Sequence, residues 1–224
     1  MLSMSGPYTR PGAVLSALIV VLGVIGLTMH RDFYAGRRRR DFFCFYTNIS
    51  NLAVLIYFAL AGPRLYAVPS LRPLIPHAEF AVTMCITLTF CVFHLVLYPA
   101  VRLAADRMPK GRQYWIVYID NLIIHYLVPI SVIIYWLLCS PGKLALRAAD
   151  ALFWTLLPLS YIGWVFFRAR RKKIIEETGS PYPYPFLDIQ ALGKARVYGM
   201  CAILYGACVL GSLASIFLIH VLLR

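Results

Sequence analysis

Two short polar clusters interrupt stretches of the sequence that are otherwise apolar. The first covers residues 47–51 (Thr-Asn-Ile-Ser-Asn), and the second covers residues 120–125 (Asp-Asn-Leu-Ile-Ile-His). The first cluster offers a hydroxyl, Thr47, and the second offers an imidazole, His125. A hydroxyl and an imidazole on neighbouring helices are the minimal parts of a nucleophile and its general base. These two residues are therefore the first candidates for chemistry.

Helical spacing decides which members of each cluster share a face. Thr47, Ser50 and Asn51 are three and four residues apart and fall on one face, while Asn48 is turned about 100° away. In the second cluster Asn121 precedes His125 by four residues and shares its face. Asp120 precedes His125 by five residues, so Asn121 is the better candidate to orient the imidazole and Asp120 is expected to face another helix.

If Thr47 and His125 meet, the chemistry that they support is attack on an ester. The imidazole takes the hydroxyl proton, the oxygen attacks the ester carbonyl, and His125 then protonates the leaving alcohol. The amides of Asn48, Asn51 or Asn121 are candidate donors to the oxyanion. Apolar walls favour a lipid ester as the substrate.

Three further polar residues are candidates for lining a substrate pocket. These are Ser50, His94 and Asp120. We assign no role to His30, which falls near a helix end, and we interpret Glu79 as a charge favoured by the helix dipole. The structural alternative stays open, since Thr and Ser in membrane helices commonly bond their own backbone and Asn commonly bridges helices.

Depth in the membrane is an obstacle to pairing Thr47 with His125. Counted at 1.5 Å per residue from Arg40 and Arg112, Thr47 lies roughly 10 Å deep and His125 roughly 20 Å deep. Pro129, four residues after His125, cannot donate to the histidine carbonyl, so we expect a kink there. A tilt, a raised third loop or the kink at Pro129 would each bring the two residues to one level.

The elements that must position these residues are six membrane-spanning helices. The chain has 224 residues, of which 61% are apolar and only 14% are charged. About 20 apolar residues cross a bilayer core. The sequence therefore predicts an all-α, integral-membrane six-helix bundle that forms one transmembrane domain over residues 1–224. The expected helices are residues 11–29, 42–61, 77–99, 114–139, 148–167 and 197–222, and the prolines at 63, 69, 73 and 76 are expected to keep the second loop out of both neighbouring helices.

The net charge of +13 is concentrated in alternate loops. Loops one, three and five carry most of the 22 Lys and Arg residues. The positive-inside rule then predicts that these loops lie in the cytoplasm. If the protein is prokaryotic, we expect it in the plasma membrane. Beside membrane helices, such basic runs contact anionic lipid headgroups, so we expect no nucleic-acid partner. No metal-ligand spacing is present, and we expect no metal or cofactor.

Three segments of this sequence resemble the androgen-induced-gene family of six-helix membrane proteins, which includes the androgen-dependent TFPI-regulating protein and prokaryotic relatives. Residues 45–52 look like the threonine segment of that family, residues 121–129 look like its histidine segment, and residues 184–188 are similar to its aromatic-proline-acidic segment. Characterised animal members are threonine hydrolases that cleave fatty acid esters of hydroxy fatty acids. The resemblance implies that Thr47 is the nucleophile and His125 the base. The short, arginine-rich loops are closer to the prokaryotic relatives, so a different substrate is compatible with the resemblance.

Two other function classes are compatible with the sequence. A proton-coupled transporter would use Asp120, His125 and His94 as a polar path through the membrane. A haem protein would use His94 and His125 as axial ligands, although the several paired histidines usual in such proteins are missing. Proton-gradient-dependent flux would identify the first class, and a Soret band would identify the second.

Overall fold

The computed structural model describes residues 10–33, 41–107, 109–176 and 178–223, with the backbone alone at 31–33, 104–106 and 113. It confirms an all-α fold with six helical spans long and apolar enough to cross a membrane. The chain is therefore built as a multi-pass integral membrane protein. The first-loop arginines lie outside the described side chains. By internal contacts the chain divides into two compact units, so a single transmembrane domain stays a prediction.

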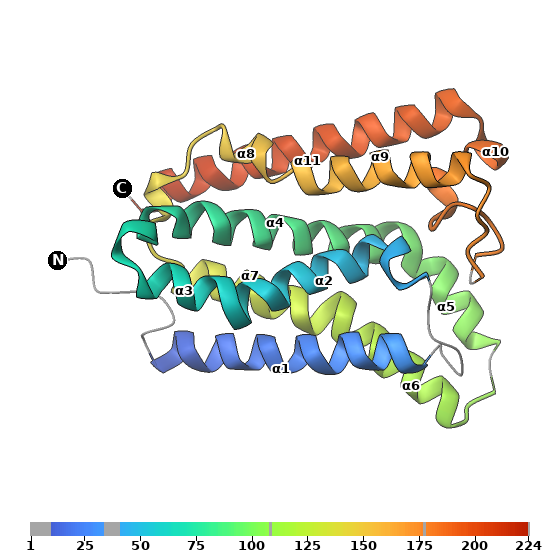
Figure 1. Cartoon of the computed structure of the whole chain (residues 1–224), viewed down its shortest axis with the longest axis horizontal. Coiled ribbons are helices and arrows are strands. Elements are labelled where there is room, and N and C mark those ends of the chain that lie inside the picture. Colours follow the sequence, from blue (N-terminus) through green and yellow to red (C-terminus); the bar gives the residue numbers. More distant parts are fainter. Residues whose placement is uncertain (1–9, 34–40, 108, 177, 224) are drawn as a thin grey trace. The chain divides into compact units, whose positions relative to one another are not determined.

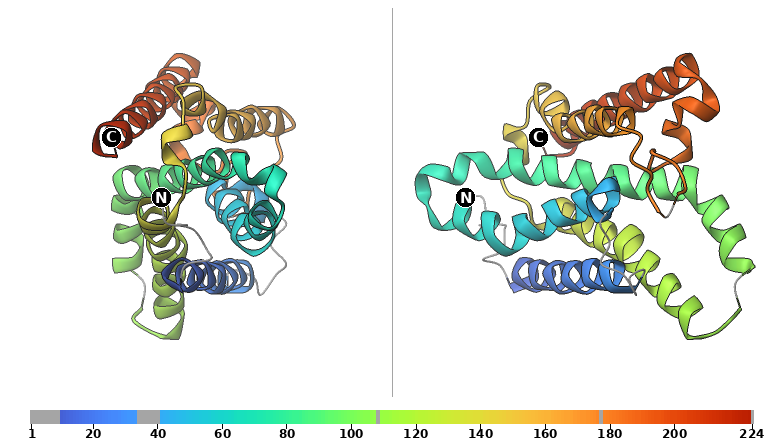
Figure 2. Two further views of the ribbon diagram at one scale, coloured as in Figure 1. Left: turned by 90° about the vertical axis from the view of Figure 1, so that its left-hand side faces the viewer. Right: turned by 45° about the vertical axis from the view of Figure 1, so that its right-hand side comes forward.

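The first unit comprises residues 1–39 and 47–146 and carries four of the spans. Its main elements are α1 (Arg10–Phe33), α2 (Tyr46–Ile56), η2 (Tyr57–Ala61), α3 (Gly62–Ala67), α4 (Ile75–Val92), η4 (Phe93–Leu97), α5 (Tyr98–Asp106), α6 (Arg112–Leu122), η5 (Ile123–Leu127) and α7 (Val128–Cys139). Between α1 and α4 lie α2 and α7 (Figures 1 and 2). Its core includes Ile19, Val54, Ile86, Ile124 and Val132, each fully buried.

Three of these spans contain a π-helical turn just before a proline. The turns η2, η4 and η5 end two residues before Pro63, Pro99 and Pro129. In η5 the N–H of Val128 bonds to the carbonyl of Ile123, five residues back. Proline has no N–H to offer, and widening the preceding turn lets the helix continue past it. The kink expected at Pro129 is thus realised as a π-turn around His125.

The same device explains where the expected helix limits were wrong. Pro63 was expected to lie in a loop, but it lies inside α3, because η2 absorbs the lost hydrogen bond and the span runs on to Ala67. The second span also starts later than residue 42. Phe42–Cys44 is a separate 3-10 turn, and the extended Phe45 divides it from α2.

At one end of the first unit, the last residues of α1 and the first residues of α2 lie short of the point that α5 and α6 reach (Figures 1 and 2). Figure 1 shows α6 inclined to α1, and α5 and α6 reach beyond the ends of α1 and α2, as in the right-hand view of Figure 2. At the opposite end of the fourth span, the ammonium of Lys143 donates to the carbonyls of Trp136 at 3.0 Å and Leu137 at 2.6 Å. Burial lowers the pKa of this ammonium. The tilt of α6 matters because it changes the level at which His125 sits.

The second unit comprises residues 40–46 and 147–224. Its elements are η1 (Phe42–Cys44), α8 (Asp150–Phe153), α9 (Leu156–Arg170), η7 (Pro185–Leu187), α10 (Ile189–Leu192) and α11 (Lys194–Leu222). The Trp154 indole donates to Ser212 at 2.7 Å, which ties the α8–α9 turn to α11. The hydroxyl of Tyr161 donates to the Cys44 carbonyl at 2.7 Å. The second of these contacts holds Cys44, and with it η1, against α9.

The segment at residues 184–188 has a structural role in the second unit. The carboxylate of Asp188 accepts from the backbone N–H groups of Gln190 and Ala191, which caps α10. Its other oxygen accepts from the Ser180 hydroxyl at 2.8 Å. Burial, and then the charge of Asp188, raises the pKa of the Tyr182 phenol. The aspartate therefore organises the fifth loop.

Candidate functional site in the first unit

The candidate site lies where α1 packs closely against the π-turn η5. A Cβ added at Gly26 would lie 2.7 Å from Ile124 Cγ2 and 2.8 Å from Ile123 Cγ2. Both distances are shorter than real Cβ contacts, so only glycine permits α1 to pack this closely on the π-turn. His30 follows Gly26 by four residues and therefore lies on the same face of α1. This face brings a second histidine to the fourth span.

One amide joins the two polar clusters. Nδ2 of Asn51 donates to the carbonyl of Thr47 at 2.8 Å and to the carbonyl of Ile124 at 3.1 Å. Asn51 and Ile124 are both fully buried. The turn that carries Thr47 is thus fixed against the residue that precedes His125. This contact brings the clusters to one level despite the depth difference expected from counting residues.

The third span completes the support of the threonine turn. The hydroxyls of Ser50 and Thr89 share a hydrogen bond of 2.6 Å, and Ser50 also donates to the Thr47 carbonyl at 3.0 Å. Both Ser50 and Asn51 therefore hold the backbone of Thr47. With both amide hydrogens of Asn51 already used, its role is to position that backbone, while Asn48 and Asn121 stay the candidate oxyanion donors.

His125 lies in an apolar environment and is only 6% exposed. Its ring stacks on Phe93 with 3.6 Å between ring centroids and 9° between planes. Among the described residues, its Nδ1 has no hydrogen-bond partner. Within the same part of the chain no hydrogen bond joins the imidazole to Thr47 Oγ1. The imidazole is thus held by stacking, and Nδ1 has not been committed to another side chain.

Asn121 does not orient the imidazole in this structure. Its Nδ2 donates to the carbonyl of Val117 at 2.9 Å. The expectation was wrong because a shared helix face does not decide which group an amide bonds. Here the amide bonds the backbone of its own helix, four residues back.

The histidine that does receive a carboxylate is His30. Its Nδ1 lies 2.6 Å from Oδ2 of Asp120, and the side chain of Asp120 is fully buried. Asp120 thus faces another helix, as its spacing predicts. His30 was expected near water, but it is only 8% exposed, because α1 continues past it to Phe33. Its four-residue spacing from Gly26 places both residues on one face of α1, but the spacing does not say which helix that face meets.

Glu79 forms a second polar centre, farther along the bundle. Its Oε1 accepts hydrogen bonds from the hydroxyls of Tyr57 at 3.1 Å, Tyr66 at 3.0 Å and Tyr135 at 3.2 Å. Glu79 is 2% exposed. The helix-dipole interpretation of this residue was wrong, because Glu79 lies inside the bundle, where three phenol donors replace water.

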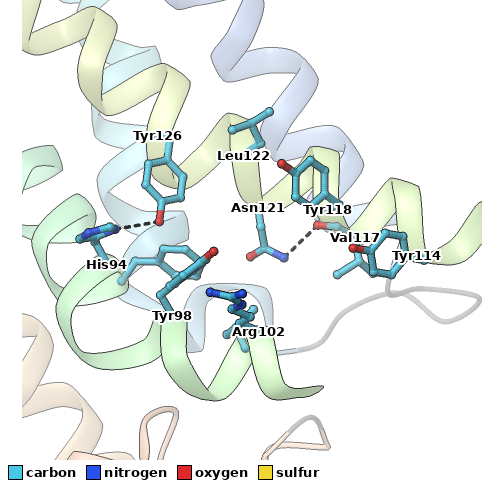
Figure 3. A pocket seen from close by; sticks show the side chains of 11 residues that line it. His94, Tyr98, Arg102, Tyr114, Val117, Tyr118, Asn121, Leu122 and Tyr126 are labelled. Atoms are coloured by element: carbon cyan, nitrogen blue, oxygen red, sulfur yellow. Dashed lines mark hydrogen bonds between the residues drawn. The ribbon is translucent and has the colours of Figure 1, made fainter. Parts of the chain in front are cut away.

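A cavity of about 580 Å³ lies beside His125. It is lined by residues of η4 and α5 on one side and of α6 and η5 on the other: Phe93, His94, Tyr98, Val101, Arg102, Tyr114, Val117, Tyr118, Asn121, Leu122 and Tyr126. His94 lines this cavity, and Nδ1 of this histidine lies 3.0 Å from the Tyr126 hydroxyl (Figure 3). Its role toward a substrate stays a prediction. Neither Ser50 nor Asp120 lines this cavity.

The ring of Phe93 is the wall between the cavity and His125. It lines the cavity and also stacks on the imidazole. A ligand in the cavity would reach His125 only after this ring moved. Nothing in the sequence indicated that Phe93 separates the cavity from His125, since a phenylalanine within an apolar span is not distinctive.

Comparison with known proteins adds no family to these observations. No protein-family model, curated protein or solved structure matches the chain.

Proposed function

We propose that this protein is an intramembrane threonine hydrolase that cleaves lipid esters of the fatty acid ester of hydroxy fatty acid type. The observation that carries the proposal is the Asn51 bridge. One amide nitrogen holds the Thr47 carbonyl and the carbonyl of Ile124, the residue next to His125. The likeness of residues 45–52 and 121–129 to the threonine and histidine segments of the androgen-induced-gene family adds support.

The reaction follows from the groups at the site. The imidazole of His125 takes the proton of Thr47 Oγ1 while that oxygen attacks the ester carbonyl carbon. The tetrahedral intermediate collapses, the bond to the alcohol oxygen breaks, and His125 returns the proton to that oxygen. Water then attacks the threonyl ester with His125 as base, which releases the fatty acid and restores the hydroxyl. Asn48 would donate to the oxyanion, since Asn121 lines the cavity on the other side of the Phe93 ring.

Bringing the base and the nucleophile together requires a local movement when substrate binds. Catalytic hydrogen bonds are often absent before substrate arrives. The π-turn around His125 and the stacked ring of Phe93 are the parts that would adjust. A base held by stacking on an aromatic ring can rotate at a lower cost than one fixed by a charged hydrogen bond.

The test is hydrolysis of a long-chain ester by the purified full-length protein. We expect Thr47→Ala and His125→Gln each to abolish hydrolysis, and Thr47→Ser to retain part of it because a hydroxyl is restored. Thr87→Ala is the matched control, since it removes a threonine hydroxyl of α4 that bonds the Thr83 carbonyl and takes no part in holding the Thr47 turn. Unchanged hydrolysis in Thr47→Ala or in His125→Gln would contradict the proposal.

The buried His30–Asp120 contact favours a second candidate function, a proton-coupled transporter. Paired ionisable groups inside membrane spans often form proton relays. This candidate predicts substrate flux in proteoliposomes that depends on a pH gradient and is lost in Asp120→Asn. If the protein is a hydrolase, we expect no such flux, and we expect ester hydrolysis to be lost whenever the Thr47 hydroxyl is removed.

The orientation belongs with the proposal. We propose that loops one, three and five lie in the cytoplasm because they carry most of the basic residues, beside anionic lipid headgroups, in the plasma membrane if the protein is prokaryotic. Cysteine accessibility in loop three, measured at Lys110→Cys in intact and in opened cells, would test this arrangement. Labelling only after the cells are opened is the expected result.

A further inference from the structure

The cavity beside His125 contains a set of hydrogen-bond donors suited to an anion. The guanidinium of Arg102, the amide of Asn121 and the hydroxyl of Tyr98 face the same space (Figure 3). One amide hydrogen of Asn121 bonds to Val117, which leaves the second for a ligand. None of the eleven described lining residues is acidic. An arginine fork with neighbouring neutral donors matches the oxygens of a phosphate or a carboxylate.

The rest of the cavity wall is apolar, which points to an anion attached to a hydrocarbon chain. Phe93, Val101, Val117 and Leu122 line it together with the faces of the tyrosine rings. Its volume of about 580 Å³ falls within the range of small-molecule sites. Beside it, Leu95 is 73% exposed on the third span. Leu95 follows the lining residue His94, and an apolar side chain exposed in a membrane span is expected to face hydrocarbon.

The position of the cavity matches the depth of a lipid head group. It lies where the third span ends and the fourth begins, close to loop three, and Arg102 is exposed there. The rings of Tyr114, Trp115 and Tyr118 pack together on the same helix. Aromatic clusters of this kind mark the boundary between hydrocarbon and head groups.

We propose that this cavity binds the anionic head group, a phosphate or a carboxylate, of a membrane amphiphile, with Arg102 as the charge that selects it. The apolar chain of the amphiphile extends from the cavity into the surrounding hydrocarbon. This binding site goes beyond the proposed hydrolysis and does not depend on it, because neither Thr47 nor His125 lines the cavity.

The experiment measures lipid binding to the full chain in a non-ionic detergent by native mass spectrometry. The probes are dioleoylphosphatidylglycerol and oleate, with dioleoylphosphatidylcholine as the reference that carries no net charge. We expect an anionic probe to bind about tenfold more tightly than the reference, because its anionic head forms charge-assisted bonds to Arg102. Tighter binding of phosphatidylglycerol alone identifies a phospholipid phosphate, and tighter binding of oleate alone identifies a fatty carboxylate.

Two variants separate the cavity from general surface charge. Arg102→Gln should remove the preference for the anionic probe, while Arg107→Gln, an exposed arginine that does not line the cavity, should keep it. Val117→Trp fills the cavity without removing charge and should also abolish binding, so the proposal stays testable if Arg102→Gln fails to fold. Equal affinity for all three lipids, equal losses in both arginine variants, or full binding in Val117→Trp would overturn it. Hydrolysis that persists in Arg102→Gln would leave the proposed catalytic pair intact.

Discussion

The two buried histidines of the first unit are held in opposite ways. His30 lies 2.6 Å from the carboxylate of Asp120, whereas His125 stacks on Phe93 and its Nδ1 has no hydrogen-bond partner among the described residues. Asp120 is close to His125 in sequence, yet it faces α1. This difference shows that a carboxylate a few residues from a histidine in the sequence need not bond to that histidine. The His30–Asp120 pair joins two spans, while His125 is the imidazole that can still accept a proton.

The largest effect is expected when the carboxylate is removed from His30. Asp120→Ala should lower the free energy of unfolding by about 3 kcal/mol, because it breaks a buried polar pair. Thermal melting of the helical signal in detergent micelles measures the loss. His125→Phe is the matched comparison and should change stability by less than about 1 kcal/mol, since the ring and its stacking are kept. If the two variants lost equal stability, the contrast between the histidines would fail.

A smaller loss is expected where α1 touches the π-turn. Gly26→Ala should cost about 2 kcal/mol, because the new Cβ would overlap the branched side chains of Ile123 and Ile124. Gly23→Ala is the control, since its Cβ would make an ordinary contact at 3.6 Å with Leu55. The same melting experiment should show Gly23→Ala as neutral or slightly stabilising. Equal destabilisation by both variants would count against the close approach at Gly26.

The bridge between the polar clusters is expected to contribute less to stability than to activity. Asn51→Leu should cost about 1 kcal/mol, the range measured for hydrogen bonds between membrane helices. Ester hydrolysis should nevertheless fall at least about tenfold, because the Thr47 turn would lose its link to Ile124. Ser50→Ala, which removes the bonds to Thr89 and to the Thr47 carbonyl, should lower hydrolysis by a smaller factor, since Asn51 still holds the Thr47 turn against Ile124. Full activity in Asn51→Leu would show that the bridge does not position the site.

The smallest single effect is expected at the three tyrosines around Glu79. Tyr66→Phe should cost about 0.5 kcal/mol, since Tyr57 and Tyr135 still donate to the same carboxyl oxygen. Replacing all three tyrosines by phenylalanine should cost more than the sum of the single changes, because the carboxyl then has no phenol donor. Strict additivity in melting experiments would show that the three bonds act independently. Hydrolysis should be unaffected by Tyr66→Phe.

The helical architecture could be predicted from apolar composition because span length is set by the membrane itself. The limits of the spans were predicted less well around Pro63, where composition suggests a loop and the π-turn η2 carries the helix onward. The direction in which Asp120 points was predicted from helical geometry. The same geometry did not predict the partner of Asn121, because this amide bonds the backbone of its own helix at Val117 and does not bond His125.

The candidate site was predictable in its residue types but not in its contacts. Thr47 and His125 stand out as polar residues in apolar spans, and the structure links their turns through Asn51. The role of His30 depends on the close approach at Gly26, which requires knowing which helices are neighbours. The stacking of Phe93 on His125 depends on three-dimensional packing that no local spacing encodes.

The most direct test of the central assignment is covalent labelling of Thr47 by a fluorophosphonate probe, located by mass spectrometry of the purified protein. We predict modification at Thr47 in the unaltered chain and in His30→Gln, and none in His125→Gln. Labelling that is lost in His30→Gln but kept in His125→Gln would contradict the account, and so would the absence of any modification at Thr47.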